Sequence, residues 1–162
     1  MTGRLVLRAA TVADRAAVRR LLTDPDARRY LGGPLSEADA DAAAARPPGQ
    51  HWGSFVIERD GETIGGCSLD RDRGELEVSY ALLPEHWGQG FGAEAVRAVL
   101  GWAHANTADD HVIAVTQAAN EPSRRLLERL GFVPREEFVE YDAPQVLAEA
   151  PVARFAVSPS GT

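Results

Sequence analysis

Apolar and more polar or smaller side chains alternate along several short stretches of the chain. Leu76, Val78, Tyr80 and Leu82 are each separated by one residue, and a repeat of two predicts a strand with one buried face. Runs with this alternation, or rich in β-branched residues, recur along the sequence. They predict strands at Arg4–Arg8, Trp52–Arg59, Glu62–Asp70, Gly74–Leu83, His111–Gln117, Val133–Tyr141 and Val152–Val157.

Other stretches repeat with the period of a helix. Val96, Val99 and Leu100 share one stripe, which predicts a helix over Phe91–Asn106. Capping residues and apolar stripes predict three further helices, at Thr11–Leu22, Ser36–Ala45 and Glu121–Leu130. A short helix is also expected after Pro25, reaching Tyr30. Gly131 stands where a left-handed helix cap is wanted. Loops are expected at Leu31–Pro34 and Arg46–Gly49.

The order of these elements predicts the fold class. Strands and helices follow as β-α-α-α-β-β-β-α-β-α-β-β, and Asp60-Gly61 predicts a tight hairpin between the second and third strands. This order predicts an α/β (α+β) domain with a mixed, mostly antiparallel sheet of about seven strands and helices on its faces. We expect one domain over residues 4–157 and a flexible tail over 158–162.

Composition narrows the function classes. Seventeen basic against twenty-four acidic residues give a net charge of −7, which disfavours nucleic-acid and anionic-membrane partners. The sequence has neither an apolar run of spanning length nor a signal peptide, so we expect a cytoplasmic protein. One cysteine cannot form an internal disulfide, and the four histidines lack metal-ligand spacing, so no metal is expected.

A glycine-rich segment carries the most chemical information. Gly88, Gly90 and Gly92 lie between the end of a predicted strand and the start of a predicted helix. Without Cβ atoms such a loop can curl until successive N–H groups converge. The helix adds unpaired N–H groups and a partial positive charge of about 0.5 e. An acidic protein can therefore hold a pyrophosphate on its main chain.

Two other phosphate loops fit less well. The first two glycines with Ala93 match the dinucleotide-binding fingerprint, but that fingerprint wants an acid at the end of the second strand. Here the nearby acids precede the strand that ends at Gln117. A kinase-type loop needs Gly-Lys-Ser/Thr, and the last glycine is followed by Ala-Glu. A plain glycine-rich turn stays open as the alternative for the loop taken alone.

A second motif follows the next predicted strand, where Asn120 and Ser123 open a helix that ends in Leu130-Gly-Phe132. The two motifs together resemble the GNAT superfamily of acetyl-coenzyme A-dependent N-acetyltransferases, and most closely the branch that includes the ribosomal-protein N-terminal acetyltransferases. The resemblance runs through four segments and covers nearly the whole chain: Arg4–Ala9, Glu77–Leu82, Trp87–Ala95 and Asn120–Phe132. The family's loop usually begins with Gln or Arg, whereas this chain has Trp87, as the resembling branch does.

The resemblance implies how acetyl-coenzyme A sits as co-substrate. The parallel strands Gly74–Leu83 and His111–Gln117 would splay apart, and the pantetheine arm would pair with the backbone near Leu82 and Leu83. The pyrophosphate would lie on one continuous run of loop residues: Trp87, Gly88, Gln89, Gly90, Phe91, Gly92 and Ala93.

The same resemblance assigns further ligand contacts. Asn120 would bond the pantetheine arm, and Arg125 or Arg124 would reach the nucleotide phosphates. Both arginines are equally well interpreted as solvated helix charges. His86 lies beside the loop but is interpreted as a surface residue, and Cys67 as a small buried hydrophobe.

The implied reaction is direct acetyl transfer from a thioester to an amine. The amine must lose a proton to a carboxylate, a histidine or a water chain. We expect Glu77 as the base, since alternation places it opposite Leu76 and Val78, with a water relay or a solvated strand charge as alternatives. Ser123 is the expected hydroxyl that assists the departing thiolate; its alternative is helix capping, and Tyr141 and Tyr30 are rival hydroxyls.

The acceptor is less defined than the donor. The resemblance implies a primary amine, either a protein N-terminus or a small molecule, in a pocket shaped by Asp24–Pro34 and Glu136–Pro151. The chain would act as a monomer or homodimer. A non-catalytic acyl-coenzyme A-binding module is the competing hypothesis, because no base is unambiguous, and a ligand-free scaffold is a weaker third.

Overall fold

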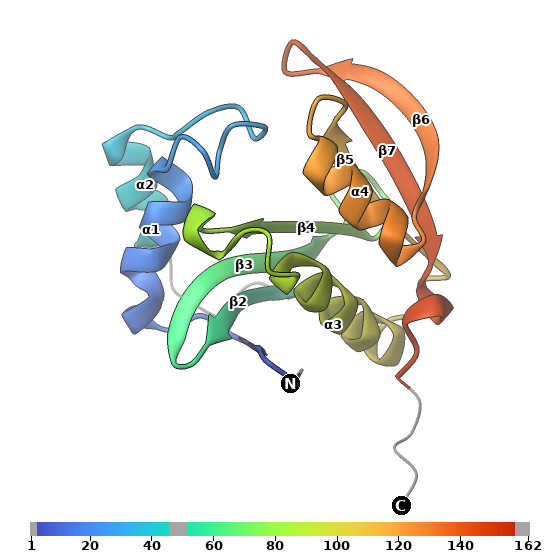
Figure 1. Cartoon of the computed structure of the whole chain (residues 1–162), viewed down its shortest axis with the longest axis horizontal. Helices are drawn as coiled ribbons and strands as arrows, with labels where there is room; N and C mark the ends of the chain where they lie inside the picture. The colour runs from blue at the N-terminus through green and yellow to red at the C-terminus, as the bar shows by residue number, and fades with distance from the viewer. Residues whose placement is uncertain (1–2, 46–51, 158–162) are drawn as a thin grey trace, which may run out of the picture.

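A computed structural model describes residues 3–45 and 52–157, which form a single seven-stranded sheet flanked by helices (Figure 1). The strands lie in the order β1-β2-β3-β4-β5-β7-β6, and every neighbouring pair is antiparallel except β4 and β5. The strands are β1 Val6–Arg8, β2 Ser54–Arg59, β3 Glu62–Asp70, β4 Glu77–Leu82, β5 His111–Gln117, β6 Val133–Glu140 and β7 Ala143–Pro151. The predicted α/β fold with a mixed, mostly antiparallel sheet is confirmed.

The described residues also form four α-helices and three short 3₁₀ turns. The helices are α1 Arg15–Thr23, α2 Glu37–Ala44, α3 Phe91–Asn106 and α4 Glu121–Leu130, and the 3₁₀ turns are η1 Val12–Asp14, η2 Pro84–His86 and η3 Val152–Phe155. Asp60 and Gly61 form the predicted turn between β2 and β3, and both have positive φ. Gly131 caps α4 in the left-handed conformation, as its position predicts.

The core lies between the sheet and α3. Leu76, Val78 and Leu82 of the β4 segment are buried together with Val96 and Leu100 of α3. Burying one such side chain contributes about 1.5–3 kcal/mol, so the stripe on α3 and the alternation in β4 fix how these two elements pack. This contact positions the start of α3 beside the end of β4 (Figure 1).

The parallel pair β4–β5 holds together at one point. Glu77 is paired with Ile113, and the amide of Ile113 donates to the carbonyl of Leu76 at 2.8 Å. No further register pair joins these two strands in the described residues, and Figure 1 shows them diverging. The expected splayed parallel pair is present.

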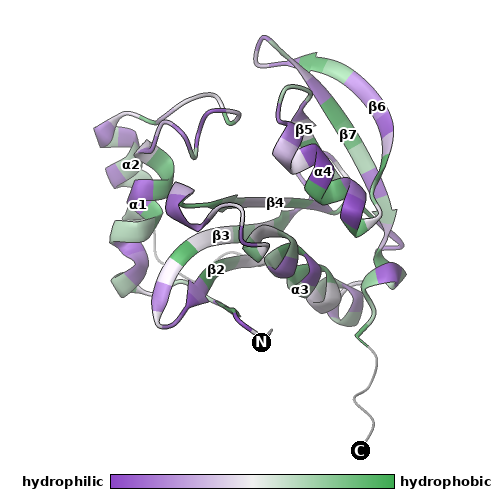
Figure 2. Cartoon of the chain, viewed as in Figure 1, coloured by the Kyte–Doolittle hydropathy of each residue, from purple (hydrophilic) through white to green (hydrophobic). Residues whose placement is uncertain are grey.

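The last expected strand is placed wrongly. The strand predicted at Val152–Val157 is in fact β7, which ends at Pro151, and η3 follows it. β7 pairs with β5 along one edge and with β6 along the other, and four consecutive residues, 145–148, are buried, so no alternation marks them. Figure 2 shows β7 apolar through its middle, while the edge strand β6 is mostly polar.

The short helix expected to reach Tyr30 is also wrong. The Asp24 carboxylate accepts the amides of Asp26 and Ala27 at 2.9 Å, and this local turn competes with helix. The Arg28 guanidinium donates to the carbonyls of Leu31 and Gly33, which closes the segment as a loop. The expected loop Arg46–Gly49 and the tail from residue 158 lie outside the described residues.

A buried carboxylate ties the N-terminal elements to the sheet. Asp14 is 4 % exposed and accepts two hydrogen bonds from the Arg8 guanidinium, at 2.8 and 3.0 Å, and others from Thr63 and Thr11. The bond from Arg8 holds the pKa of Asp14 well below its usual range. Because this pKa is lowered by folding, the stabilisation is present above the unfolded pKa of about 3.9 and is lost as pH falls below it.

Asp14→Asn should therefore lower the free energy of unfolding by about 2–3 kcal/mol at pH 7, because it leaves Arg8 without its buried partner. Urea unfolding at pH 7 and pH 3 measures this, and the difference between variant and wild type should shrink at pH 3. Asp60→Asn, at an 83 % exposed turn side chain, is the control and should stay within about 0.5 kcal/mol. An equally small loss for Asp14→Asn would contradict this role.

Candidate functional site

The glycine-rich segment forms a tight bend between η2 and α3. Gly88 and Gly90 have φ of +72° and +82°, in the left-handed region, and Gly90 is the N-cap of α3. Residues with side chains adopt this region at a cost of about 1–2 kcal/mol. The sequence therefore bends here because it places glycine at both positions. The bend is exposed, whereas Phe91 and Gly92 behind it are buried.

The amides of this bend are the main feature of the site. The amides of His86 and Trp87 donate to the carbonyls of Leu83 and Pro84. Within residues 3–45 and 52–157, no acceptor meets the amides from Gly88 to Ala93, and the first helical bond is donated by Glu94. These six N–H groups at the positive end of α3 fit an anion such as a diphosphate.

Arg4 lies under the bend from the neighbouring strand segment. Its guanidinium donates to the Gln89 carbonyl at 3.0 Å, pairs with Glu94 at 2.7 Å and lies 4.7 Å from the centre of the Phe91 ring. A cation on the carbonyl of Gln89 holds that oxygen on one side of the bend. The amides from Gly88 to Ala93 take no part in this contact.

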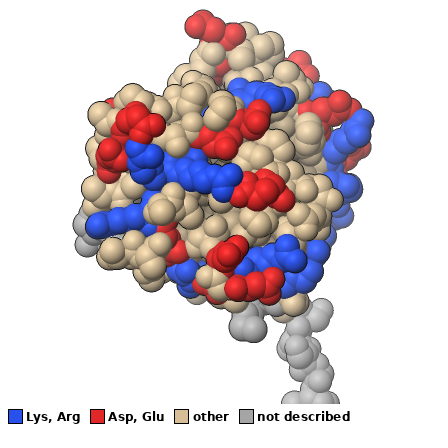
Figure 3. Space-filling model, turned by 60° about the vertical axis from the view of Figure 1, so that its left-hand side comes forward, with Lys and Arg blue, Asp and Glu red and all other residues tan. Residues whose placement is uncertain are grey.

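Basic side chains do not form an extended patch on the face shown in Figure 3. Acidic and basic side chains intermingle there, and ion pairs such as Arg20 with Glu85 and Arg19 with Glu37 balance the charge locally. Anion binding by main-chain amides agrees with this distribution and with the net charge of −7.

Beyond Glu77 and Ile113 the strands β4 and β5 separate, and we call the gap between them the parting. One edge of β4 faces this parting. The Leu83 amide donates to Ile64 of β3 at 2.9 Å, so the main-chain groups of Leu82 and Tyr80 point the other way, toward the parting. The Leu82 carbonyl accepts the Trp87 indole N–H at 2.9 Å. Of the two residues expected to pair with a pantetheine arm, Leu83 is thus bonded inside the sheet, and Tyr80 is the additional residue on the parted edge.

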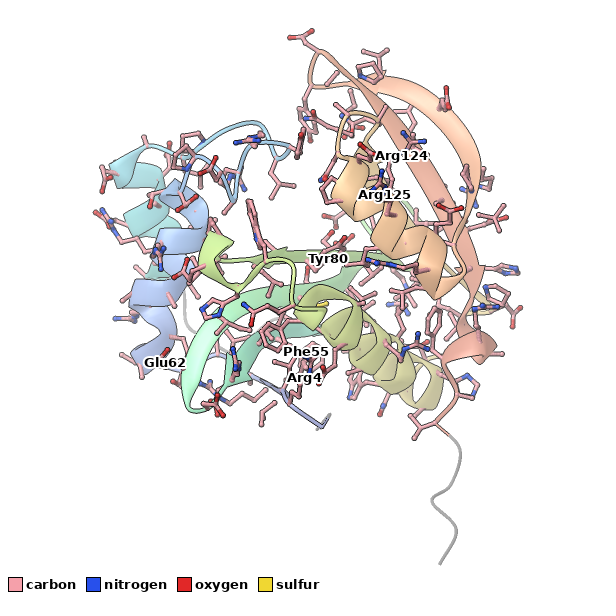
Figure 4. The ribbon with its side chains drawn as sticks, in the orientation of Figure 1. Arg4, Phe55, Glu62, Tyr80, Arg124 and Arg125 are labelled. Atoms are coloured by element: carbon pink, nitrogen blue, oxygen red, sulfur yellow. The ribbon has the colours of Figure 1, made fainter. Side chains whose placement is uncertain are left out.

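Two hydroxyls meet at this edge. The Tyr80 hydroxyl and Ser123 Oγ are 2.7 Å apart (Tyr80 is labelled in Figure 4). The Asn120 side chain caps α4 by accepting the Ser123 amide at 3.2 Å. The cap is therefore Asn120, and the Ser123 hydroxyl bonds Tyr80 instead. Sequence reasoning missed Tyr80, because its alternation with Val78 and Leu82 reads as core packing.

Glu77 lies at the point where β4 and β5 begin to part. It is 9 % exposed, and its carboxylate pairs with the Arg73 guanidinium at 3.2 Å. Burial raises the pKa of the Glu77 carboxyl, and Arg73 opposes that rise. Arg73 also binds Glu140 at 2.7 Å. Tyr80 follows Glu77 by three positions, so the two side chains leave opposite faces of β4.

The two arginines of α4 lie apart from the bend. Arg125 pairs with Glu121, and Arg124 donates to the Ala118 carbonyl at 3.1 Å. Both are exposed on the outer side of α4 (Figure 4), where they line a shallow hollow with Glu128. Their expected contact with nucleotide phosphates stays a prediction.

The remaining candidates are two tyrosines and Cys67, which lies in β3 opposite Tyr80. Tyr141 is 81 % exposed at the tip of the β6–β7 hairpin, and Tyr30 is half-buried in the loop after α1. Cys67 is buried, and burial raises the pKa of its thiol to about 12, which suppresses the thiolate. Among the described residues, no group of three or more His, Cys, Asp or Glu could hold a metal ion, and no helix is long and apolar enough to cross a membrane.

Comparison with known proteins places these features in a family. The model of the acetyltransferase (GNAT) domain matches residues 4–133. "Uncharacterized N-acetyltransferase YoaA" of Bacillus subtilis (strain 168) is 29% identical over 144 residues, covering 81% of this chain and 80% of that protein. "Uncharacterized N-acetyltransferase p20" of Bacillus licheniformis is 27% identical over 145 residues, with 81% and 80% covered.

Solved structures share the whole fold. A GNAT-family acetyltransferase from Bacillus anthracis superposes with a TM-score of 0.83 at 20% identity, covering 94% of this chain and 98% of that one. Spermidine N-acetyltransferase from Vibrio cholerae, in complex with CoA and spermine, gives 0.76 at 18% identity with 94% and 98% covered. Aminoglycoside acetyltransferase AAC(6')-Ib in complex with coenzyme A gives 0.74 at 18% identity with 93% and 96% covered.

Proposed function

The chain belongs to the GNAT acetyltransferase family, and from this premise we propose that it transfers acetyl from acetyl-coenzyme A directly to a primary amine. The observation that carries this proposal is the run of unpaired amides from Gly88 to Ala93 at the start of α3. These amides lie beside the strand β4, whose edge parts from β5. If these amides bind the diphosphate of coenzyme A, the pantetheine arm attached to it would lie along that edge.

Acetyl-coenzyme A would lie with its thioester inside the parting between β4 and β5. Its pyrophosphate would occupy the bend, and its pantetheine arm would run past Leu82 and Tyr80 along the parted edge. Since β4 and β5 meet at Glu77 and Ile113, the thioester would stop near that junction. Main-chain N–H groups of the edge would then face the carbonyl oxygen and stabilise the charge it develops.

The transfer needs one proton acceptor and one hydrogen-bond donor. The amine nitrogen forms a bond to the carbonyl carbon as the carbon–sulfur bond breaks, and its surplus proton passes to Glu77, directly or through water. The raised pKa of Glu77 makes it a better base than an ordinary glutamate. The leaving thiolate accepts a hydrogen bond from Ser123 and later takes its proton from solvent.

The acceptor is proposed only as a class. A small polyamine, an aminoglycoside and a peptide N-terminus are the candidates; the first two are named by the Vibrio cholerae and AAC(6')-Ib neighbours. The third is suggested by the sequence resemblance to ribosomal-protein N-terminal acetyltransferases. The loop 24–34 and the β6–β7 hairpin would shape the acceptor pocket in a domain of residues 4–157, as a monomer or homodimer.

A thiol-release assay tests the proposal directly. Acetyl-coenzyme A is mixed with the protein and with spermidine, kanamycin or a peptide that begins with serine, and free thiol is followed over time. We expect amine-dependent thiol release with at least one acceptor, and acetylated amine in equal amount by mass spectrometry. Coenzyme A that raises the melting temperature without any thiol release would favour the competing hypothesis of a non-catalytic acyl-coenzyme A-binding module.

Arg4→Lys should weaken coenzyme A binding about fivefold, because lysine cannot bind the Gln89 carbonyl and Glu94 together as the guanidinium fork does. Calorimetric titration measures the Kd of coenzyme A and of pantetheine, and only the ligand with the pyrophosphate should be affected. Arg59→Lys is the matched control, since Arg59 lies at the same 4.7 Å from the Phe91 ring centre. Equal losses for both ligands would contradict the bracing role of Arg4.

A further inference from the structure

We propose that Tyr80 is a positioning residue that donates a hydrogen bond to Ser123 Oγ and so directs the Ser123 hydroxyl proton toward the leaving sulfur. This inference rests on the proposed function. It assigns a role to a residue that faces the interior between β4, α3 and α4 and that the reaction as described above does not use.

The number of protons on the two hydroxyls decides which of them donates the hydrogen bond between Tyr80 and Ser123. Each hydroxyl carries one proton, and the two oxygens are 2.7 Å apart. If Ser123 gives its proton to a hydrogen bond with sulfur, the bond between the two oxygens must be donated by Tyr80. A hydroxyl that accepts such a bond is polarised and becomes a stronger donor. No proton leaves Tyr80 in this arrangement.

The surroundings of Tyr80 keep its ring in place. A Cβ built on Gly92 would lie 3.7 Å from Tyr80 Cε2, an ordinary contact distance, and 3.0 Å from Leu126, so the ring packs against α3 at Gly92. On the sheet side, Tyr80 is paired with Cys67 of β3. The ring is thus enclosed by α3, α4 and the sheet, and its hydroxyl cannot swing far from α4.

Ser123 is held from its other side. Its amide is bound by the Asn120 side chain, which fixes the first turn of α4 and the direction of the Ser123 side chain. Burial raises the pKa of the Tyr80 phenol, so it stays protonated and remains a donor at neutral pH. With its amide anchored and its oxygen accepting from a protonated partner, the Ser123 hydroxyl is free to donate its own proton away from Tyr80.

A double-mutant cycle tests the pair. Single-turnover thiol release is measured for wild type, Tyr80→Phe, Ser123→Ala and the double variant, with the best acceptor from the amine panel. We expect each single substitution to slow transfer about tenfold and the double variant to be no slower than Ser123→Ala, since Tyr80 acts through the serine. The Kd of coenzyme A should change less than about twofold in all three.

Controls separate a structural effect from this role. Tyr80→Phe keeps the ring, so its melting temperature should match the wild type, and Ser54→Ala removes an exposed hydroxyl from β2 without slowing transfer. Losses that multiply to about a hundredfold in the double variant would overturn the coupling. So would a slow Tyr80→Phe beside an unaffected Ser123→Ala, which would make Tyr80 the direct donor. No turnover by wild type with any amine would instead reject the proposed function itself.

Discussion

Glu77→Gln should lower the rate of acetyl transfer about a hundredfold at pH 7, because glutamine cannot take the proton that the attacking amine must lose. The affinity for coenzyme A should stay unchanged, since Glu77 leaves the face of β4 opposite Tyr80. Wild-type activity should fall as pH drops through the raised pKa of Glu77, where its base form is lost. Steady-state rates measured from the ordinary pKa range of a glutamate up to the pKa of the amine test both effects.

The pH dependence of the penalty separates the two possible bases. The deficit of Glu77→Gln should be largest where most of the amine is protonated and should shrink as pH nears the pKa of the amine. A deficit that does not vary with pH would favour a water relay. Glu75→Gln is the matched control, since Glu75 precedes the strand by two residues, is exposed and pairs with Arg135; it should retain the wild-type rate.

Gly90→Val should raise the Kd of coenzyme A about thirtyfold, equivalent to about 2 kcal/mol. A β-branched residue is strained at φ +82°, and its Cβ would come within 3.4 Å of the Arg4 guanidinium. The bend would relax and its amides would no longer converge. Calorimetric titration with coenzyme A measures the loss.

A matched glycine separates local strain from loss of the site. Gly61 has φ +84° in the β2–β3 hairpin, with open space around it, so Gly61→Val carries the same backbone strain away from the bend. It should lower stability and leave the Kd unchanged. Unchanged affinity in Gly90→Val would show that the bend does not bind the diphosphate.

Local patterns predicted most of the fold. The alternation in β4, the stripe on α3 and the turn at Asp60-Gly61 each depend on neighbours in sequence, and the structure confirms all three. The position of β7 could not be predicted, because four consecutive residues, 145–148, are buried without alternation, and its place between β5 and β6 is decided by the topology and not by its own residues. The loop after α1 depends on side-chain bonds from Asp24 and Arg28 that compete with helix.

The candidate site divides in the same way. The glycine bend could be predicted because left-handed backbone and free helix amides are local properties. The contact between Tyr80 and Ser123 could not, since it joins residues 43 apart in sequence. It forms because Tyr80 leaves the face of β4 on which α3 and α4 pack. The bond of Arg73 to Glu140 likewise depends on where the topology places β6, the edge strand of the sheet.

The single junction between β4 and β5 has a mechanical consequence. Among the described residues a single register pair, Glu77 with Ile113, links the two halves of the sheet, whose other strands pair as antiparallel ladders. Acetyl-coenzyme A bound along the parted edge of β4 would pair like an eighth strand. Its hydrogen bonds would then help to hold the two halves of the sheet together. The stability of the folded protein would then change during each catalytic cycle. It would be greatest with acetyl-coenzyme A bound and lowest after coenzyme A has left.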